Sequence, residues 1–172
     1  MGMDVMGKNA RSEKGEYFRN NVWWWRPLWG YCLDIHPDLA GKVEYGHSND
    51  GDGLDGDDAR DLGLRLIMDI ERGTTAEYEQ AYREQLASLP MEDCEWCGTT
   101  GIRTDEVGIE NGMPTQALEA DVASIVGRTH GYCNACGGYG KRESWLANYP
   151  FSVDNVRRFA EFLLDCGGFE IW

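Results

Sequence analysis

The chain lacks the features that direct a protein into or across a membrane. In its 172 residues, no window approaches the run of about 18 apolar residues that a membrane-spanning helix needs. The first residues also lack the basic and apolar regions of a secretory signal. These absences predict a soluble, intracellular protein that has no membrane partner.

The sequence also lacks every short motif that announces a common enzyme. There is no nucleophile elbow, no Walker A loop, no dinucleotide-binding fingerprint and no HExxH helix. Histidine is scarce, with three in the chain. His36, His47 and the many carboxylates are nevertheless candidates for an acid–base site. Active sites assemble from distant residues, so these absences favour a non-enzymatic protein without excluding an enzyme.

Positive charge is scarce as well. Sixteen Lys and Arg stand against 30 Asp and Glu, which gives a net charge of −14. Much of the excess is concentrated in residues 44–71, whose acidic residues are Glu44, Asp50, Asp52, Asp55, Asp57, Asp58, Asp61, Asp69 and Glu71. Such a surface repels phosphate backbones, which disfavours a nucleic-acid partner. The simplest interpretation is a solvated acidic face.

Against these absences stands a duplicated cysteine motif. The segment from Cys94 to Arg103 (CEWCGTTGIR) and the segment from Cys133 to Arg142 (CNACGGYGKR) share both cysteines, two glycines and the final arginine. Each CxxC turn brings two thiolates together, and the glycine after it permits a positive φ that turns backbone N–H groups towards sulfur. Two such turns predict one zinc ion bound by Cys94, Cys97, Cys133 and Cys136.

Two alternatives to this zinc site carry less weight. A redox-active CxxC usually occurs once, at the start of a helix and without this glycine pattern. A catalytic zinc keeps a coordination position open for water, whereas four cysteines close the shell and indicate a structural ion. His130 lies three residues before Cys133 and is interpreted as a surface residue.

Aromatic residues crowd the start of the chain. We expect a strand followed by a helix that begins near Pro27 and runs through Trp29 to Ile35. Three consecutive tryptophans cannot all face one side of a strand, so some belong to the core and others to a surface. The candidate aromatic partner surface comprises Trp23, Trp24, Trp25 and Trp29.

An acidic loop follows, rich in glycine and aspartate. Its residues Asp50, Asp52, Asp55, Asp57 and Asp58 form the second part of the candidate partner surface. A calcium-loop alignment starting at Ser48 places Ala59 where a bidentate glutamate belongs, which disfavours calcium. Aspartates that complement the dipole of the next helix explain the same residues without a metal ion.

The remaining pattern predicts an α+β fold with a small sheet, four to five helices and an embedded four-cysteine zinc ribbon. Apolar spacing predicts a helix that ends at Gly73, a second helix from a Thr74–Glu77 capping box to about Leu86, and a helix capped by Ser152. The sheet is built partly from the N-terminal strand and from residues 169–172. We expect one domain over 1–172, with the zinc module at 92–143 and a helical insertion at about 114–126.

Two resemblances extend this interpretation. CNACGGYG, and CEWCGTTG with Thr99 in place of a glycine, resemble the CxxCxGxG repeat of the cysteine-rich zinc region in DnaJ-type co-chaperones. That family uses four repeats for two zinc ions beside a J domain. This sequence has two repeats and no His-Pro-Asp tripeptide of a J domain, so the resemblance implies zinc and a local β-ribbon but not chaperone function. The segments YFRNNVWWWRPLW, HSNDGDGL and CGGFEIW resemble an uncharacterised family of bacteria and their phages, which implies the cytoplasm of a bacterium or a phage-infected cell.

Together these features predict a zinc-stabilised, non-enzymatic intracellular protein that acts through protein–protein interaction. One alternative is an acidic mimic of nucleic acid that inhibits a nuclease or a defence complex, as in phage counter-defence. Another is a zinc-ribbon nucleic-acid binder that uses Arg103, Arg128, Lys141 and Arg142.

Overall fold

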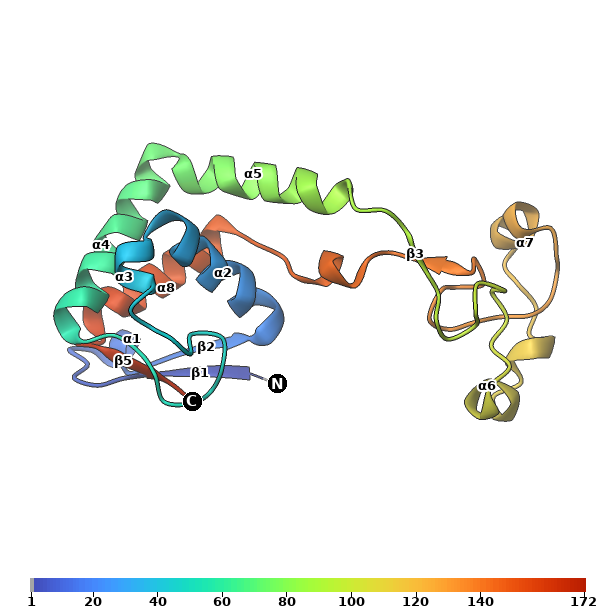
Figure 1. Ribbon diagram of the computed structural model, residues 1–172, viewed down its shortest axis with the longest axis horizontal. Helices are drawn as coiled ribbons and strands as arrows, with labels where there is room; N and C mark the ends of the chain where they lie inside the picture. The colour runs from blue at the N-terminus through green and yellow to red at the C-terminus, as the bar shows by residue number, and fades with distance from the viewer. Residues whose placement is uncertain (1) are drawn as a thin grey trace. The chain divides into compact units, whose positions relative to one another are not determined.

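The computed structural model describes residues 2–172, and these form an α+β protein with eight helices and two small sheets (Figure 1). The α+β class that the sequence predicts is therefore confirmed. Its contacts divide the chain into two compact units. The first, here called the body, comprises the chain up to Ala87 together with Asn148–Trp172, and the second, the cysteine unit, comprises Ser88–Ala147.

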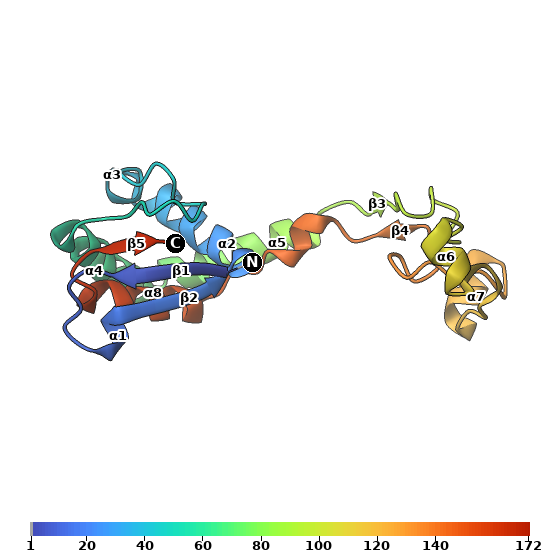
Figure 2. The ribbon, with the colours of Figure 1, turned by 90° about the horizontal axis from the view of Figure 1, so that it is seen from below.

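Three antiparallel strands form the sheet of the body (Figure 2). They are β1 (Gly2–Gly7), β2 (Tyr17–Asn21) and β5 (Phe169–Ile171), in the order β2-β1-β5. Val5 lies at the centre, opposite Phe18 on one side and Ile171 on the other. The prediction that the N-terminal strand and the end of the chain belong to one small sheet is confirmed.

The helices of the body begin and end at residues suited to those positions. They are α1 (Glu13–Glu16), α2 (Val22–Ile35), α3 (Pro37–Ala40), α4 (Gly56–Arg72), α5 (Thr74–Ala87) and α8 (Val153–Asp165). Asp55 caps α4 by accepting from two backbone N–H groups, and Gly73 ends that helix with a φ of 86°. Ser152 caps α8 as predicted. The Thr74–Glu77 capping box is not formed, because Thr74 already lies inside α5.

The tryptophans lie on a helix, and the predicted strand through them is wrong. Helix α2 begins at Val22, and Pro27 lies inside it. The missed signal is Asn21, which ends β2 and whose side chain accepts a hydrogen bond from the Trp24 N–H at 3.1 Å. On a helix, residues four apart share a face. Trp25 and Trp29 therefore both point inwards and stack with their ring centroids 5.5 Å apart.

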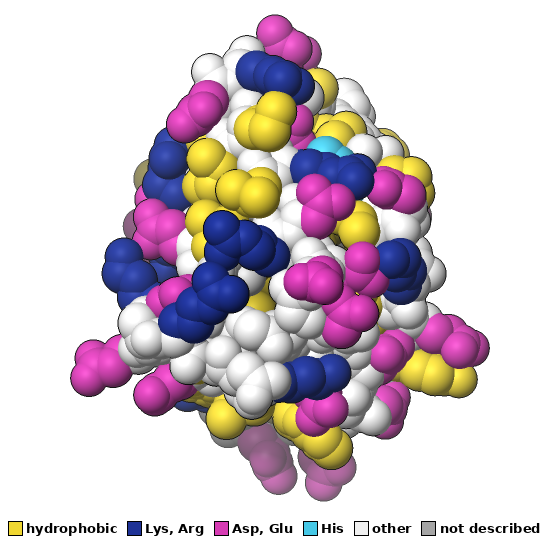
Figure 3. All heavy atoms as spheres, turned by 90° about the vertical axis from the view of Figure 1, so that its left-hand side faces the viewer, with side chains coloured by type: hydrophobic (Ala, Val, Ile, Leu, Met, Phe, Trp, Pro, Cys, Tyr) yellow, Lys and Arg dark blue, Asp and Glu magenta, His cyan; other side chains and the backbone are white. Residues whose placement is uncertain are grey.

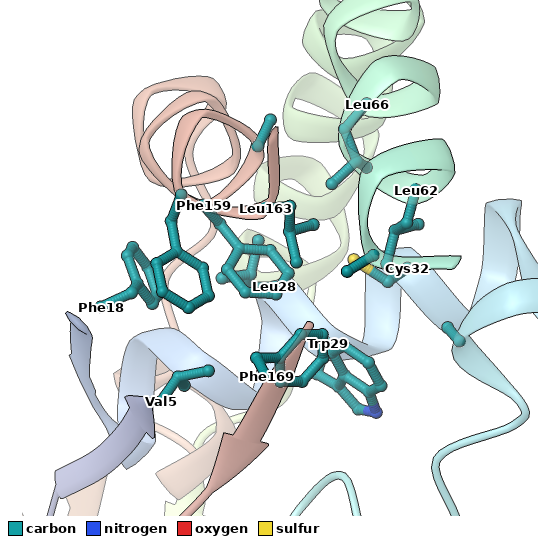
Figure 4. Packing of buried hydrophobic residues seen from close by; sticks show 14 of the residues in the cluster. Val5, Phe18, Leu28, Trp29, Cys32, Leu62, Leu66, Phe159, Leu163 and Phe169 are labelled. Atoms are coloured by element: carbon teal, nitrogen blue, oxygen red, sulfur yellow. The ribbon is translucent and has the colours of Figure 1, made fainter. Parts of the chain in front are cut away.

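The core of the body lies between the sheet, α2, α4 and α8 (Figure 4). Aromatic rings fill its centre, where Trp29 and Phe159 lie with Phe169 of β5. Helices α4 and α8 approach closely at Gly63, where an added Cβ would lie 3.0 Å from the Leu163 Cβ. Leu62 and Leu66 of α4 are fully buried beside this contact.

The cysteine unit has little regular structure. Its elements are β3 (Glu92–Asp93), α6 (Glu106–Glu110), the 3₁₀ turn η1 (Met113–Thr115), α7 (Ala120–Val126) and β4 (Lys141–Arg142). A second 3₁₀ turn, η2 (Trp145–Asn148), begins in this unit and ends at the first residue of the returning body segment. The predicted helix at about 114–126 is interrupted. Residues 117 and 118 instead pair with 129 and 130, through an Ala117–His130 bridge and a Leu118 N–H to Thr129 carbonyl bond. Gly127 ends α7 with a φ of 71°, the position expected for it.

The single domain expected over 1–172 stays a prediction, because compact units defined by contacts are not by themselves separate domains. The expected module at 92–143 lies within the cysteine unit, and its short antiparallel ribbon is the pairing of β3 with β4. Of the helices described in residues 2–172, none combines the length and the apolar composition that crossing a bilayer requires.

Candidate metal centre

Four cysteines from the two CxxC turns meet at one point in the cysteine unit. The sulfurs of Cys94, Cys97, Cys133 and Cys136 all lie within 4.8 Å of one another, and all four residues are buried. The distance between sulfurs is 3.9 Å for Cys94 and Cys133 and 3.8 Å for Cys97 and Cys136. A tetrahedral zinc site with Zn–S bonds of about 2.3 Å separates its sulfurs by about 3.8 Å. The four predicted ligands thus form a cluster whose dimensions suit a tetrahedral metal ion.

Backbone N–H groups support the sulfurs in the same way in both halves. The Gly101 N–H donates to Cys97 Sγ at 3.2 Å, and the Gly140 N–H donates to Cys136 Sγ at 3.2 Å. Such donors stabilise a thiolate and orient it towards a metal ion. The sequence pointed to Gly98 and Gly137, which have positive φ values of 55° and 60°. This positive φ was expected, and the N–H groups that donate belong to the glycines three residues further on, which the duplicated motif also contains.

The two turns lie against each other through these later glycines. A Cβ added at Gly101 would lie 2.1 Å from the Gly138 carbonyl oxygen, and one added at Gly140 would lie 2.1 Å from the Thr99 carbonyl oxygen. Because Thr99 is the counterpart of Gly138, the two close contacts are equivalent. The spacing of glycines thus reflects a steric requirement, since any side chain at either position would push the two halves apart.

Thr99 carries backbone strain that its counterpart avoids. Among residues 2–172 it is the non-glycine residue with a positive φ, at 68°. A β-branched side chain is unfavourable in this region, where Gly138 adopts a φ of 95° without penalty. The one departure from the glycine motif is therefore accommodated by strain, and the geometry of the turn is kept.

Electrostatics favours a cation at this point. Burial raises the pKa of the Cys97 thiol, and it raises that of Cys136 to about 12. At Cys94, burial raises the pKa but hydrogen bonds from Cys97 outweigh it, so the pKa of that thiol is lowered. Thiolates gathered in a buried site need a compensating positive charge, and a divalent ion supplies it. Four sulfur donors at these separations suit a tetrahedral zinc or iron ion.

Arg103 fastens the first turn to the second. Its guanidinium donates to both carboxylate oxygens of Asp105, at 2.8 and 2.9 Å, and to Asn134 Oδ1 at 2.9 Å. The ring of Trp96 lies over it, with 4.9 Å from the guanidinium carbon to the ring centroid. Arg103 also lowers the pKa of Asp105 by hydrogen bonding to its carboxylate. The arginine that ends the first repeat thus has a structural role, because it links the first turn to Asn134 of the second turn.

The cysteines are the core of this unit. Its buried cluster consists of the four cysteines, and the other buried apolar side chains described there are Met113 and Val122. By contrast, the unit exposes much of its apolar surface. Of the fifteen large apolar side chains exposed in the described chain, eight lie in this unit: Met91, Trp96, Val107, Ile109, Ile125, Tyr139, Trp145 and Leu146.

The tryptophans of the candidate partner surface separate into two pairs. Trp25 and Trp29 are buried core residues at 0% and 1% exposure, so neither belongs to a surface. Their burial follows from the helical spacing described above. Trp23 and Trp24 are partly exposed. Trp23 packs on Tyr149 with 4.8 Å between ring centroids.

The acidic loop uses several of its carboxylates to organise the backbone. Asp52 accepts hydrogen bonds from the Tyr45 and Gly53 N–H groups, at 2.9 and 2.8 Å. Asp55 caps α4, and Asp58 forms an ion pair with Lys42. Asp50 accepts a hydrogen bond from the Ser48 hydroxyl. Within residues 2–172, the group of side chains placed to hold a metal ion is the cysteine cluster.

Acidic and basic side chains are interspersed on the face of the protein that Figure 3 shows. The four bases considered for nucleic-acid binding are all engaged with protein groups. Arg103 is held as described, the Arg128 guanidinium donates to the Gly138 carbonyl at 2.7 Å, and Lys141 and Arg142 face carboxylates at 3.8 and 3.1 Å. These bases therefore brace the cysteine unit.

No family model, characterised protein or solved structure matches this chain.

Proposed function

We propose that the chain is a non-enzymatic protein that acts by binding another protein, and that a structural zinc ion holds its cysteine unit in the binding conformation. The observation that carries this proposal is the combination found in residues 88–147. A closed four-cysteine cluster forms the core of the unit, while its exposed surface is rich in large apolar side chains.

The closed cluster supports a structural role for the ion. Four sulfurs complete a tetrahedral shell and leave no position for water or substrate. The donors from Gly101 and Gly140 and the burial of all four cysteines keep that shell in place. Zinc fits this arrangement without a redox role, because Zn²⁺ undergoes no redox change. Iron in the same shell would give a coloured protein, so the choice is open to direct measurement.

The apolar surface supports a protein partner. Ile109 of α6 and Ile125 of α7 are 63% and 72% exposed. Exposure of aliphatic side chains to water is unfavourable in free energy, and several of them together on one surface mark an interaction site. Both lie in the segment between the two CxxC turns, whose ends the metal ion would hold together. Loss of the ion is therefore expected to abolish partner binding as well as local folding.

The metal is tested by elemental analysis of the purified chain. We expect one zinc per chain, reduced to none when Cys133 and Cys136 are replaced by serine. Iron in place of zinc, or no bound metal at all, would contradict the proposal.

The partner surface is tested by quantitative affinity capture from the cells that express the chain. The double variant Ile109→Ser and Ile125→Ser should lose any specific partner at least about fivefold. The control is Leu64→Ser together with Met68→Ser, which changes side chains of α4 that are 45% and 42% exposed on the body. Chelation of the metal should release the same partner. A protein set that is unchanged by the isoleucine substitutions and by chelation would overturn the proposal.

A further inference from the structure

The two edges of the body sheet differ in whether they are covered. Beside β5, the loop at 51–54 closes the edge. The Gly51 N–H donates to the Ile171 carbonyl, the Ile171 N–H to the Asp52 carbonyl and the Phe169 N–H to the Leu54 carbonyl, at 2.8 to 3.0 Å. At the other edge lies β2, and no strand or loop pairs with its outer side in the described chain.

The register shows which backbone groups β2 presents. Asp4 and Trp172 exchange two hydrogen bonds, so the N–H and C=O of Asp4 point towards β5. Alternate residues of a strand point to opposite sides, and those of Met3 and Val5 therefore point to β2. Their partners are Asn20 and Phe18. The N–H and C=O of Arg19 consequently point outwards, and no hydrogen bond within residues 2–172 uses them.

Two hollows flank this edge between β2 and α8. One, of about 190 Å³, is lined by Lys14, Tyr17, Phe18, Arg158, Glu161 and Phe162. The other, of about 200 Å³, is lined by Asn20, Trp24, Ser152, Asp154, Asn155 and Arg158. Phe18 lines the first hollow and Asn20, two residues further along β2, lines the second. The side chains at alternate positions of an added strand have the same spacing, so such a strand can place one side chain in each hollow.

The floor of the second hollow is already ordered. Asn20 Nδ2 donates to Asn155 Oδ1 at 2.8 Å, and Asn155 Nδ2 donates to the Trp24 carbonyl at 3.4 Å. Both asparagines are buried, at 7% and 6% exposure. A preformed floor reduces the entropy that a ligand must overcome on binding.

Arg158 lies between the hollows and lines both. Its guanidinium is placed over the Phe18 ring at 5.8 Å, and no carboxylate of the described chain lies within ion-pair distance of it. By contrast, Lys14 is paired with Glu161 and Arg19 with Asp4. Because the guanidinium of Arg158 forms no ion pair within the described chain, it can bind a carboxylate of a ligand through two parallel hydrogen bonds.

We propose that the groove between β2 and α8 binds an extended peptide of a partner protein, which adds a strand beside Arg19 and places an aspartate or glutamate against Arg158. This surface lies on the body and uses no residue of the cysteine unit, so its test is independent of the function proposed above. A second copy of the chain is the less suitable occupant. Antiparallel pairing of two β2 strands about Arg19 would place two arginines opposite each other, which is unfavourable.

The test begins with selection of random nine-residue peptides displayed on phage against the full chain. We expect enrichment of peptides in which an acidic residue is flanked by β-branched residues. Synthetic copies of the most enriched peptides are then measured by fluorescence anisotropy. The Arg158→Glu substitution should weaken them at least about tenfold, the loss expected from one charge-assisted contact. The control is Arg157→Glu, an exposed neighbour on α8 that lines neither hollow.

The main-chain contact is tested from both sides. Arg19→Pro removes an outward N–H and no ladder hydrogen bond, a change that edge strands tolerate, and it should abolish binding. Methylation of the peptide at its alternate amide nitrogens should do the same without altering the protein. Failure to enrich any peptide, or binding that survives Arg158→Glu and amide methylation, would overturn the proposal. So would a dimer, seen by sedimentation, that Arg19→Pro dissociates.

Discussion

Removal of the metal ion should unfold the cysteine unit and leave the body folded. Apart from the four cysteines, Met113 and Val122 are the buried apolar side chains described in this unit. Full burial of two such side chains contributes about 3–6 kcal/mol, whereas structural zinc sites contribute about 10–16 kcal/mol at neutral pH. The body keeps its own core of aromatic and aliphatic side chains, which contains no metal ligand. The expected result is therefore local unfolding of residues 88–147.

Thiol reactivity gives a direct assay of this prediction. All six cysteines are free and buried. On chelation, the four cysteines of the metal site should react with a thiol reagent within minutes. Cys32 and Cys166, both at 0% exposure in the body, should react only when denaturant is added. Readdition of zinc should restore protection of the four.

Hydrogen exchange provides an independent measurement of the same event. The Gly101 and Gly140 amides donate to sulfur, so they should exchange slowly with the metal bound and rapidly without it. Amides of α4 and α8 should keep their protection in both states. If the metal-free chain retains slow exchange at Gly101 and Gly140, or if all six thiols become reactive together, the reasoning from the small core of this unit is wrong.

Three further predictions concern single residues. Gly101→Ala should weaken zinc binding at least about tenfold in chelator competition, because the added Cβ would lie 2.1 Å from a carbonyl oxygen. The control is Gly112→Ala, where φ is a similar 67° but no atom lies near the added Cβ. That substitution should have little effect on zinc binding beyond local strain. Thr99→Asn should raise the stability of the cysteine unit by about 0.5–1 kcal/mol, because asparagine tolerates a positive φ better than a β-branched residue does. Thermal melting measures this change, and a lower melting temperature would contradict the assignment of strain to Thr99. Burial raises the pKa of Tyr31 from its usual 10.0 to about 12. The folded state therefore holds this proton more tightly, and the free energy of unfolding should fall between about pH 10 and 12, by about 1.4 kcal/mol per pH unit from this group. Denaturant unfolding of Tyr31→Phe should show a correspondingly shallower decline, and an identical decline would refute this cause.

The four cysteines could be assigned from sequence because coordination fixes residue type and spacing together. Two CxxC turns with matching glycines leave few arrangements other than a shared tetrahedral site. Gly101 and Gly140 each donate to a sulfur of their own turn. The requirement for glycine at these positions comes from contact between the two turns, which the sequence of a single turn does not reveal. The duplicated motif contained the signal, since the later glycine recurs in both copies.

The tryptophan segment shows what sequence reasoning could not settle. Three adjacent aromatic residues are compatible with either a strand or a helix, and Pro27 was interpreted as a helix start. A single side-chain hydrogen bond from the Trp24 N–H to Asn21 starts the helix earlier. That shift changes which tryptophans face the core. The open edge of β2 was equally hidden, because it depends on strand order, which joins β1 to a strand more than 160 residues away.

The strand order of the body also constrains the order in which the chain can fold during synthesis. Strand β1 lies between β2 and β5, and α8 packs against α4, so the body cannot close until the residues near Ile171 have left the ribosome. The cysteine unit is synthesised completely before that point. It can therefore bring its four cysteines together before the last helix and strand of the body have been synthesised. During that interval, which lasts a few seconds at about 5–20 residues per second, the faces of α2 and α4 that pack on α8 remain exposed to water.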